Sequence, residues 1–159
     1  MRLSTRGRYA VMAMVELAAR DGDDAEGRCG ARGQVSLAEI AQAQRLSLAY
    51  LEQLFGPLRR GGLVVSTRGP GGGYRLARPA AEISIAAIVE AVDEPIHATR
   101  CEEGSAGCLA GERCLTHDLW AELGNQIRLF LDGVTLADVV AGRICGRAIP
   151  PLLADVAEA

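Results

Sequence analysis

The stretch from Ser36 to Arg78, SLAEIAQAQRLSLAYLEQLFGPLRRGGLVVSTRGPGGGYRLAR, contains three structural signals in succession. Two short helical patterns, each preceded by a serine, are joined by a connection of only a few residues. A strand, a glycine-rich turn and a return strand follow directly. Two helices joined by a tight turn and followed by a β-hairpin predict a winged helix-turn-helix, in which the second helix is the recognition helix.

The helix-turn-helix is predicted to span residues 37–60. Ser36 and Glu39 have the spacing of a capping box at the start of the first helix, and Ser47 is predicted to cap the second. Glutamine can pair with adenine, glutamate can accept a hydrogen bond from cytosine, and arginine can hold phosphate. Residues of these types are expected on the outward face of the second helix, which comprises Ala49, Tyr50, Glu52, Gln53, Arg59 and Arg60.

The hairpin, expected over residues 63–78, is predicted to form the wing. Arg68 lies at its tip beside Gly69, and glycine allows the backbone to approach a DNA groove or a phosphate closely. A phosphate-binding nucleotide loop is the alternative for this glycine run. The run lacks the Lys-Ser/Thr of a P-loop and is followed by a strand, which argues against that alternative.

Charge is distributed unevenly along the chain. Residues 1–78 contain 12 Arg and 7 acidic residues, a net charge of +5, whereas residues 79–159 contain 5 Arg and 13 acidic residues, a net charge of −8. The first part is therefore suited to contact with an anionic polymer. A helix is expected within residues 1–20, capped by Ser4 or Thr5. Its start carries Arg2, Arg6 and Arg8, which either face phosphate or form a solvated basic end.

Residues 101–117, CEEGSAGCLAGERCLTH, have the composition of a metal site. Three cysteines and one histidine, with glycines between them, follow the spacing Cys-x6-Cys-x5-Cys-x2-His. Cys114 and His117 are expected on the first turn of a helix, whose N-terminal partial charge favours thiolate. Buried free thiols are the alternative, but a polar, glycine-rich loop is poorly suited to burying them. The predicted ligands are Cys101, Cys108, Cys114 and His117.

The spacing alone does not separate zinc from an iron–sulfur cluster. Short structural zinc sites usually contain Cys-x2-Cys pairs, which are absent here, and the wider gaps favour a cluster. His97 is a substitute candidate for the nitrogen ligand. Cys29 and Cys145 are expected not to be ligands, because neither has further candidate ligands close by in the sequence.

The second part of the chain is predicted to be helical. Ser84 is expected to cap a helix that ends at Pro95, and residues 117–133 are predicted to form the longest helix, with a wide apolar stripe. Because the winged domain already has its own core, this stripe is expected to form a homodimer interface, which would suit palindromic DNA. A short helix should begin at Thr135. The expected units are a DNA-binding domain at 1–80, a metal loop and dimerisation helices at 81–142, and a poorly ordered tail at 143–159.

Composition narrows the class of protein further. Because 49% of the residues are hydrophobic, the chain is expected to fold around a core. No signal peptide or bilayer-spanning apolar run is found, so a cytoplasmic location without membrane contact is expected. An odd number of cysteines, five, favours reduced thiols over a disulfide framework. No nucleophile–base pair or paired-carboxylate pattern stands out, so the chain is not expected to be an enzyme.

Together these residues resemble the IscR family, the winged-helix repressors of iron–sulfur cluster assembly genes. The matching runs are MRLSTRGRYAV, LSLAYLEQLF, RGPGGGY, EAVDE, ATRC and CLTHDLW, which occur in order from residue 1 to about residue 140. The sequence departs from the family pattern in having six residues instead of five between Cys101 and Cys108, and in having Ala49 where serine is usual.

The resemblance implies a homodimer with one [2Fe-2S] cluster per subunit, held by the three cysteines and the histidine named above. It also implies DNA contacts from Tyr50, Glu52, Gln53 and Arg68. Contact with the cluster assembly machinery is expected as well. The full set of predicted DNA-binding residues is Arg2, Thr5, Ser47, Tyr50, Glu52, Gln53, Arg59, Arg60, Arg68 and Gly69.

The leading hypothesis is a transcription factor that reports cluster supply, repressing cluster assembly genes when it is loaded. A ferredoxin-like electron carrier is one alternative, which does not need a basic half with a wing. A zinc-stabilised DNA-binding protein without a sensing role is the other, and metal and sulfide analysis separates it from the first hypothesis.

Overall fold

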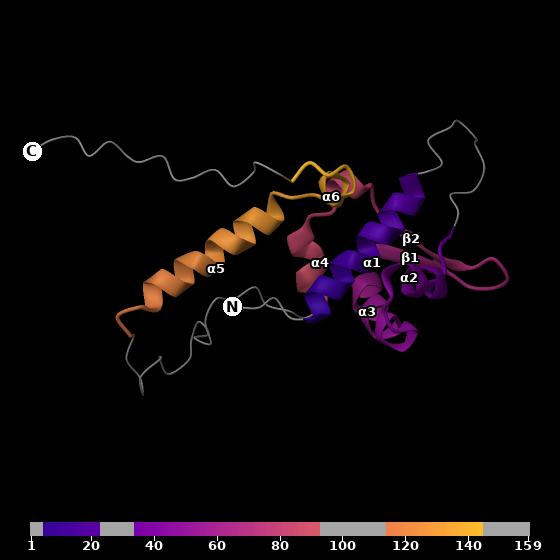
Figure 1. Ribbon diagram of the computed structural model, residues 1–159, viewed down its shortest axis with the longest axis horizontal. Helices are drawn as coiled ribbons and strands as arrows, with labels where there is room; N and C mark the ends of the chain where they lie inside the picture. Colours follow the sequence, from indigo (N-terminus) through magenta and orange to yellow (C-terminus); the bar gives the residue numbers. More distant parts are fainter. Residues whose placement is uncertain (1–4, 23–33, 93–113, 145–159) are drawn as a thin grey trace, which may run out of the picture.

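The computed structural model of the protein describes residues 5–22, 34–92 and 114–144 (Figure 1). Helices α1, α2, α3 and α4 pack together with the β1–β2 hairpin and α6, whereas α5 extends away from them (Figure 1). This mainly helical arrangement with a two-stranded hairpin confirms the predicted winged helix-turn-helix. In chain order the elements are α1 (Thr5–Gly22), α2 (Leu37–Gln44), α3 (Leu48–Arg60), β1 (Val64–Thr67), β2 (Gly73–Leu76), the 3-10 helix η1 (Ala80–Glu82), α4 (Ile85–Ala91), α5 (His117–Asp132) and α6 (Leu136–Val140).

The start of α2 has the capping box that the sequence predicts. The Ser36 hydroxyl accepts a hydrogen bond from the Glu39 backbone N–H at 3.3 Å, and the Glu39 carboxylate accepts one from the Ser36 backbone N–H at 2.8 Å. The hydrogen bonds from Ser36 lower the pKa of Glu39. At the start of α3, Ser47 occupies the N-cap position, but its side chain makes no capping hydrogen bond. The prediction for Ser47 was therefore correct in position and wrong in the capping contact.

The end of α3 is a Schellman motif that turns the chain into the wing. Gly62 has a φ of 69°, a left-handed conformation that favours glycine. Its backbone N–H donates to the Arg59 carbonyl at 3.1 Å, and the Leu63 N–H donates to the Leu58 carbonyl at 3.0 Å. Leu58 and Leu63 are both buried, so the motif also has its hydrophobic contact. The two glycines predicted to end the helix therefore do so.

The wing is an antiparallel hairpin joined to the rest of the fold at its base. Val64 of β1 lies opposite Leu76 of β2. Val35, which precedes α2, extends this sheet by one bridge: its N–H donates to the Tyr74 carbonyl at 2.9 Å, and the Tyr74 N–H donates to the Val35 carbonyl at 2.8 Å. The Tyr74 ring packs edge-on against Phe55 of α3, with centroids 4.8 Å apart. These contacts fix the position of the wing relative to the recognition helix.

A single cluster of buried side chains joins α1, α2, α3, α4 and α6 with the hairpin, and α5 reaches it through the partly buried Leu131. Ile88 of α4 and Leu136 of α6 are both fully buried in this cluster. Because these two residues lie beyond residue 80, the hydrophobic core crosses the predicted boundary between residues 1–80 and 81–142. The division of DNA binding and metal binding between these two parts remains a prediction. The largest fully buried side chains are Met14, Leu17, Ile40, Leu51, Leu54, Phe55, Leu58, Leu63, Val64, Ile83, Ile88 and Leu136.

The C-terminal end of α5 is anchored to this core. The Ser84 hydroxyl, which caps α4 as predicted, donates to the Asp132 carboxylate at 3.2 Å. Beside it, the Ile85 N–H donates to the Val134 carbonyl at 2.9 Å, and α6 begins with a capping box between Thr135 and Asp138. Helix α5 has 16 residues and α1 has 18, so the prediction that α5 is the longest helix was wrong among the described residues.

Replacing Gly73 with alanine is expected to destabilise the fold. A Cβ atom at this position would lie 2.7 Å from the Val35 carbonyl oxygen, a backbone atom that cannot move without breaking the bridge to Tyr74. We expect a loss of about 2 kcal/mol in the free energy of unfolding, measured by urea denaturation.

Gly56→Ala is the matched control for this substitution. A Cβ at Gly56 meets only the end of the Arg60 side chain at 3.7 Å, and alanine is favoured over glycine within a helix. The control should be at least as stable as the wild type. Equal stability of Gly73→Ala and the wild type would show that the Val35 backbone leaves room for a Cβ atom at residue 73.

Candidate DNA-binding face and metal site

The outward face of α3 presents the side chains that the sequence predicts. Glu52, Gln53, Arg59 and Arg60 are exposed, while Tyr50 is half-buried at the edge of this face. The opposite face is buried in the core through Leu51, Leu54, Phe55 and Leu58. The exposed side therefore carries hydrogen-bonding and cationic groups, which are the groups needed to contact base edges and phosphates.

The wing places a further cation beside this helix. Arg68 and Gly69 are exposed at the tip of the hairpin. Gly69 has a φ of 108°, which L side chains rarely adopt, and its carbonyl accepts a hydrogen bond from the Gly72 N–H at 2.9 Å. Arg59 connects the two elements, because its Nη1 lies 3.4 Å from the Ser66 hydroxyl of β1. This contact joins the exposed end of α3 to strand β1 of the wing.

The start of α1 adjoins the recognition helix through aromatic side chains. The Tyr9 and Tyr50 rings meet edge-to-face, with centroids 5.9 Å apart, and the Arg8 guanidinium lies 5.8 Å from the Tyr9 ring centroid. Thr5 is exposed at the first turn of α1, whereas Arg2 lies outside the described residues. The sequence analysis did not identify Tyr9, because a tyrosine within an apolar helical run has no local signal that distinguishes it from a core residue.

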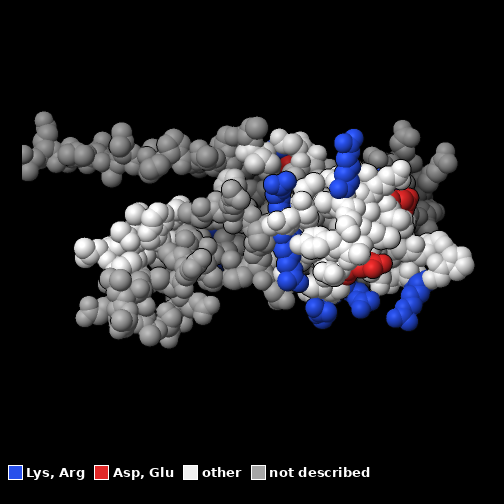
Figure 2. Space-filling model, turned by 60° about the horizontal axis from the view of Figure 1, so that its bottom comes forward, with Lys and Arg blue, Asp and Glu red and all other residues white. Residues whose placement is uncertain are grey.

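Figure 2 shows the side of the molecule on which α3 lies. Arginine side chains surround this face and acidic side chains are sparse on it. Phosphate contacts from arginine supply sequence-independent affinity for DNA, and a polar helix within such a ring supplies sequence readout. The arrangement of charge agrees with the excess of arginine in residues 1–78.

Two of the predicted metal ligands lie together at the N-terminal end of α5. His117 is the first residue of the helix, and its backbone N–H donates to the Cys114 carbonyl at 3.0 Å. The Cys114 sulfur lies 3.5 Å from the Thr116 hydroxyl. Cys114 therefore belongs to the turn before α5. The sequence analysis had placed it on the first turn of the helix, which was wrong. The helix begins at His117, with Thr116 at the N-cap position and no capping hydrogen bond from its side chain.

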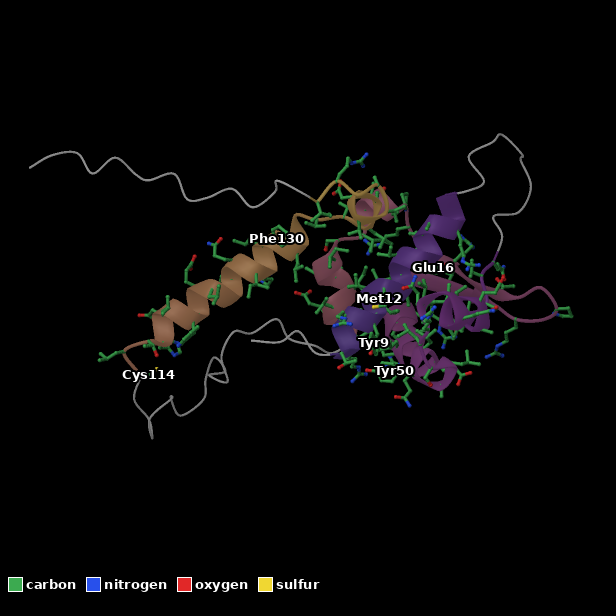
Figure 3. All side chains as sticks on the ribbon, in the orientation of Figure 1. Tyr9, Met12, Glu16, Tyr50, Cys114 and Phe130 are labelled. Atoms are coloured by element: carbon green, nitrogen blue, oxygen red, sulfur yellow. The ribbon has the colours of Figure 1, made fainter. Side chains whose placement is uncertain are left out.

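This end of α5 fits a metal centre in its chemistry. A thiol and an imidazole are the donors that zinc and iron–sulfur centres use. Among the described residues no larger cluster of candidate ligands occurs. The other predicted ligands, Cys101 and Cys108, lie outside the described residues, as do His97, Cys29 and Cys145. Figure 3 shows Cys114 at one end of α5 and Phe130 near the other.

Helix α5 leaves a row of large apolar side chains uncovered. Leu119 is 62% exposed, Phe130 is 43% exposed and Trp120 is 40% exposed. Burial of such side chains is strongly favourable in water, so an exposed row of them on one helix marks an interaction surface. Among the described residues, none of the helices combines the length and apolar character needed to cross a bilayer.

A recognition helix with exposed polar groups, a glycine-tipped wing beside it and arginines around both define a winged-helix DNA-binding protein. Comparison with known proteins identifies the family within this class. The Rrf2 family model, described as an iron-dependent transcriptional regulator, matches residues 3–142. The HTH-type transcriptional regulator IscR of Yersinia enterocolitica is 50% identical over 140 residues, which make up 88% of this chain and 79% of that relative.

Solved structures agree with this similarity. The structure of T. potens IscR has a TM-score of 0.68 at 35% identity and covers 90% of this chain and 88% of its own. CymR, the global cysteine regulator of B. subtilis, has a TM-score of 0.70 at 34% identity, covering 89% of this chain and 98% of its own. The chain belongs to the Rrf2 family of transcriptional regulators, and within that family it is of the IscR type. Because these relatives are regulators, the prediction that the chain is not an enzyme is confirmed.

Proposed function

We propose that this DNA-binding regulator senses the supply of iron–sulfur clusters through a [2Fe-2S] cluster held by Cys101, Cys108, Cys114 and His117. The observation that carries the proposal is the pairing of Cys114 and His117 at one end of a helix whose other end is anchored to the DNA-binding body. Such a cluster is gained when the supply of iron–sulfur clusters is high and lost when it is low. An imidazole ligand makes the cluster more labile than four thiolates would.

The link between the two sites runs along α5. The ligand loop leads directly into this helix, and the contact between Ser84 and Asp132 fixes the opposite end beside α4. The uncovered apolar side chains of α5 suit a two-fold homodimer, in which the placement of α5 sets the spacing of two recognition helices. Cluster binding at the N-terminal end of α5 therefore changes how the dimer fits its operator. In this proposal the loaded form represses cluster assembly genes and loss of the cluster relieves repression.

The proposed DNA contacts include both helix and wing. Ser47 fits this role because its exposed hydroxyl makes no capping hydrogen bond. Glu52 is proposed to discriminate between sites, since a carboxylate near the bases accepts only partners that can donate to it. Cytoplasmic location and contact with the assembly machinery remain predictions. The full proposed set is Arg2, Thr5, Ser47, Tyr50, Glu52, Gln53, Arg59, Arg60, Arg68 and Gly69.

The alternatives are less well supported. An electron carrier has no use for a recognition helix and a wing, and the family assignment gives it no support. A zinc-stabilised regulator would have the same DNA-binding half, so only the composition of the metal centre separates it from the proposal.

Anaerobic purification and reconstitution test the proposed function. We expect about two iron and two sulfide ions per chain and absorbance in the visible region. Affinity for duplex DNA should fall steeply as salt rises, because arginine–phosphate contacts release counterions. Zinc without sulfide would refute the cluster. Equal affinity of loaded and cluster-free protein for every candidate promoter would refute sensing.

A further inference from the structure

Helix α1 contacts the helix-turn-helix at two points, one on each side of the turn at residues 45–47. The first point involves Glu16, near the middle of α1. One oxygen of its carboxylate accepts a hydrogen bond from the Gln44 amide of α2 at 2.7 Å. The other oxygen accepts one from Arg20 Nε, also at 2.7 Å. Gln44 is the last residue of α2, so this contact holds the helix where it enters the turn.

The second contact lies where the chain leaves the turn. Tyr50, the third residue of α3, packs edge-to-face on Tyr9 of α1 with an interplanar angle of 89°. Both tyrosines are half-buried and pack against the core. Aromatic pairs of this geometry contribute about 0.5–1.5 kcal/mol beyond the area they bury. Tyr9 and Glu16 are seven residues apart, two turns of the same helix, so they lie on one face of α1. Figure 3 shows Tyr9 beside Tyr50, with Glu16 further along α1.

The Glu16 carboxylate forms an ion pair with Arg20 and a hydrogen bond with the neutral amide of Gln44. The hydrogen bonds from Arg20 and Gln44 lower the pKa of Glu16, so its carboxylate is charged at neutral pH. Arg20 balances that charge, so the carboxylate can hold the Gln44 amide without adding a net negative charge to the DNA-binding half. The turn itself contains Arg45 in a left-handed conformation with a φ of 52°, and the Leu46 N–H donates to the Ala41 carbonyl at 2.9 Å.

We propose that Tyr9 and Glu16 are positioning residues, which hold the turn between α2 and α3 against α1 and thereby set the orientation of the recognition helix for base readout. Hydrogen bonds to base edges weaken steeply with misalignment, whereas long arginine side chains can follow a phosphate as the helix moves. Loss of either contact should therefore reduce sequence discrimination more than general DNA affinity. The inference rests on the DNA-reading role of α3 and does not depend on the metal site.

The test compares affinity for two duplexes. One is selected by the wild-type protein from a random duplex library, and the other is its scrambled counterpart. Gln44→Glu places two carboxylates in contact and should lower the ratio of selected to scrambled affinity about tenfold. The swap of Glu16→Gln combined with Gln44→Glu keeps the wild-type charge, restores an amide–carboxylate pair and should recover the ratio to within about twofold. Gln42→Glu adds the same charge at an exposed position of α2 and is the matched control.

Tyr9 is tested in the same assay. Tyr9→Leu removes the ring and should lower the ratio about tenfold, while Tyr9→Phe keeps the edge-to-face contact and should retain it. All variants are compared at a temperature at which circular dichroism shows them fully folded.

Four results would overturn the inference in whole or in part. An unchanged ratio in both Gln44→Glu and Tyr9→Leu would show that neither contact orients α3. Parallel loss of affinity for both duplexes would show a role in stability alone. Failure of the charge-conserving swap to recover the ratio would remove Glu16 from the positioning set. A wild-type chain that selects no sequence would overturn the DNA-reading role itself, and the inference with it.

Discussion

Replacing Cys114 with alanine is expected to lower the iron and sulfide content of the reconstituted protein to below about a tenth of the wild-type value. Cys114 is one of two proposed ligands that the structure describes, and its backbone is hydrogen-bonded to His117, the other. Losing a thiolate from a four-ligand [2Fe-2S] centre would leave one iron atom with one protein donor in place of two, and water replaces the missing donor poorly. The measurement is iron and sulfide analysis together with visible absorbance after anaerobic reconstitution.

The same substitution should leave the fold intact. Cys114 lies in the turn before α5 and takes no part in the buried core, so removal of its sulfur opens no cavity there. Cys145→Ala is the matched control, because it deletes one thiol at a position not proposed as a ligand. Cys114→Ala should bind DNA with the same affinity before and after cluster reconstitution. Iron and sulfide at wild-type levels in Cys114→Ala would remove this residue from the ligand set.

Replacing Phe130 with aspartate is expected to weaken the proposed homodimer by about 100-fold or more. Phe130 is 43% exposed on α5. It lies about 20° around the helix from Leu119 and about 80° from Trp120. Burial of a phenylalanine contributes about 1.5–3 kcal/mol, and a two-fold interface buries the same residue twice. A carboxylate at this position would also have to be desolvated without a partner. Sedimentation equilibrium measures the dimer dissociation constant directly.

Leu129→Asp provides the control for Phe130→Asp. Leu129 is 56% exposed, so it starts from a similar exposure and undergoes the same change in charge. It lies about 100° around the helix from Phe130 and about 180° from Trp120. We expect Leu129→Asp to dimerise as the wild type does. Equal dissociation constants for the two variants would show that the apolar row of α5 is not the dimer interface.

Much of the DNA-binding half follows from short-range signals. The capping box of Ser36 and Glu39 marks the start of α2, and Gly62 supplies the left-handed residue that ends α3. Thr135 likewise caps α6 where the sequence predicts it. Each of these signals acts over three or four residues, so each can be recognised in the sequence without knowledge of what packs nearby.

Other features were misjudged because a residue of the right type does not by itself fix where a helix begins or ends. Thr116, and not Cys114, borders the first turn of α5, and Cys114 is joined to His117 by a backbone hydrogen bond in the turn before the helix. Ser47 has the right residue type and position for a cap, yet its side chain makes no capping bond. The relative lengths of α1 and α5 were also misjudged, because α1 continues to Gly22.

By itself, the sequence determined the order and type of the elements and the basic character of the first half, and it predicts the donor set of the metal loop. These depend on residue type, spacing and helical or strand periodicity, which are local properties. Only the tertiary structure decided that Glu16 meets Gln44, 28 residues away, that Tyr9 meets Tyr50, and that α4 and α6 share the core with α1. Such pairs carry no local signal, because they arise when separately formed helices bury their apolar faces against one another.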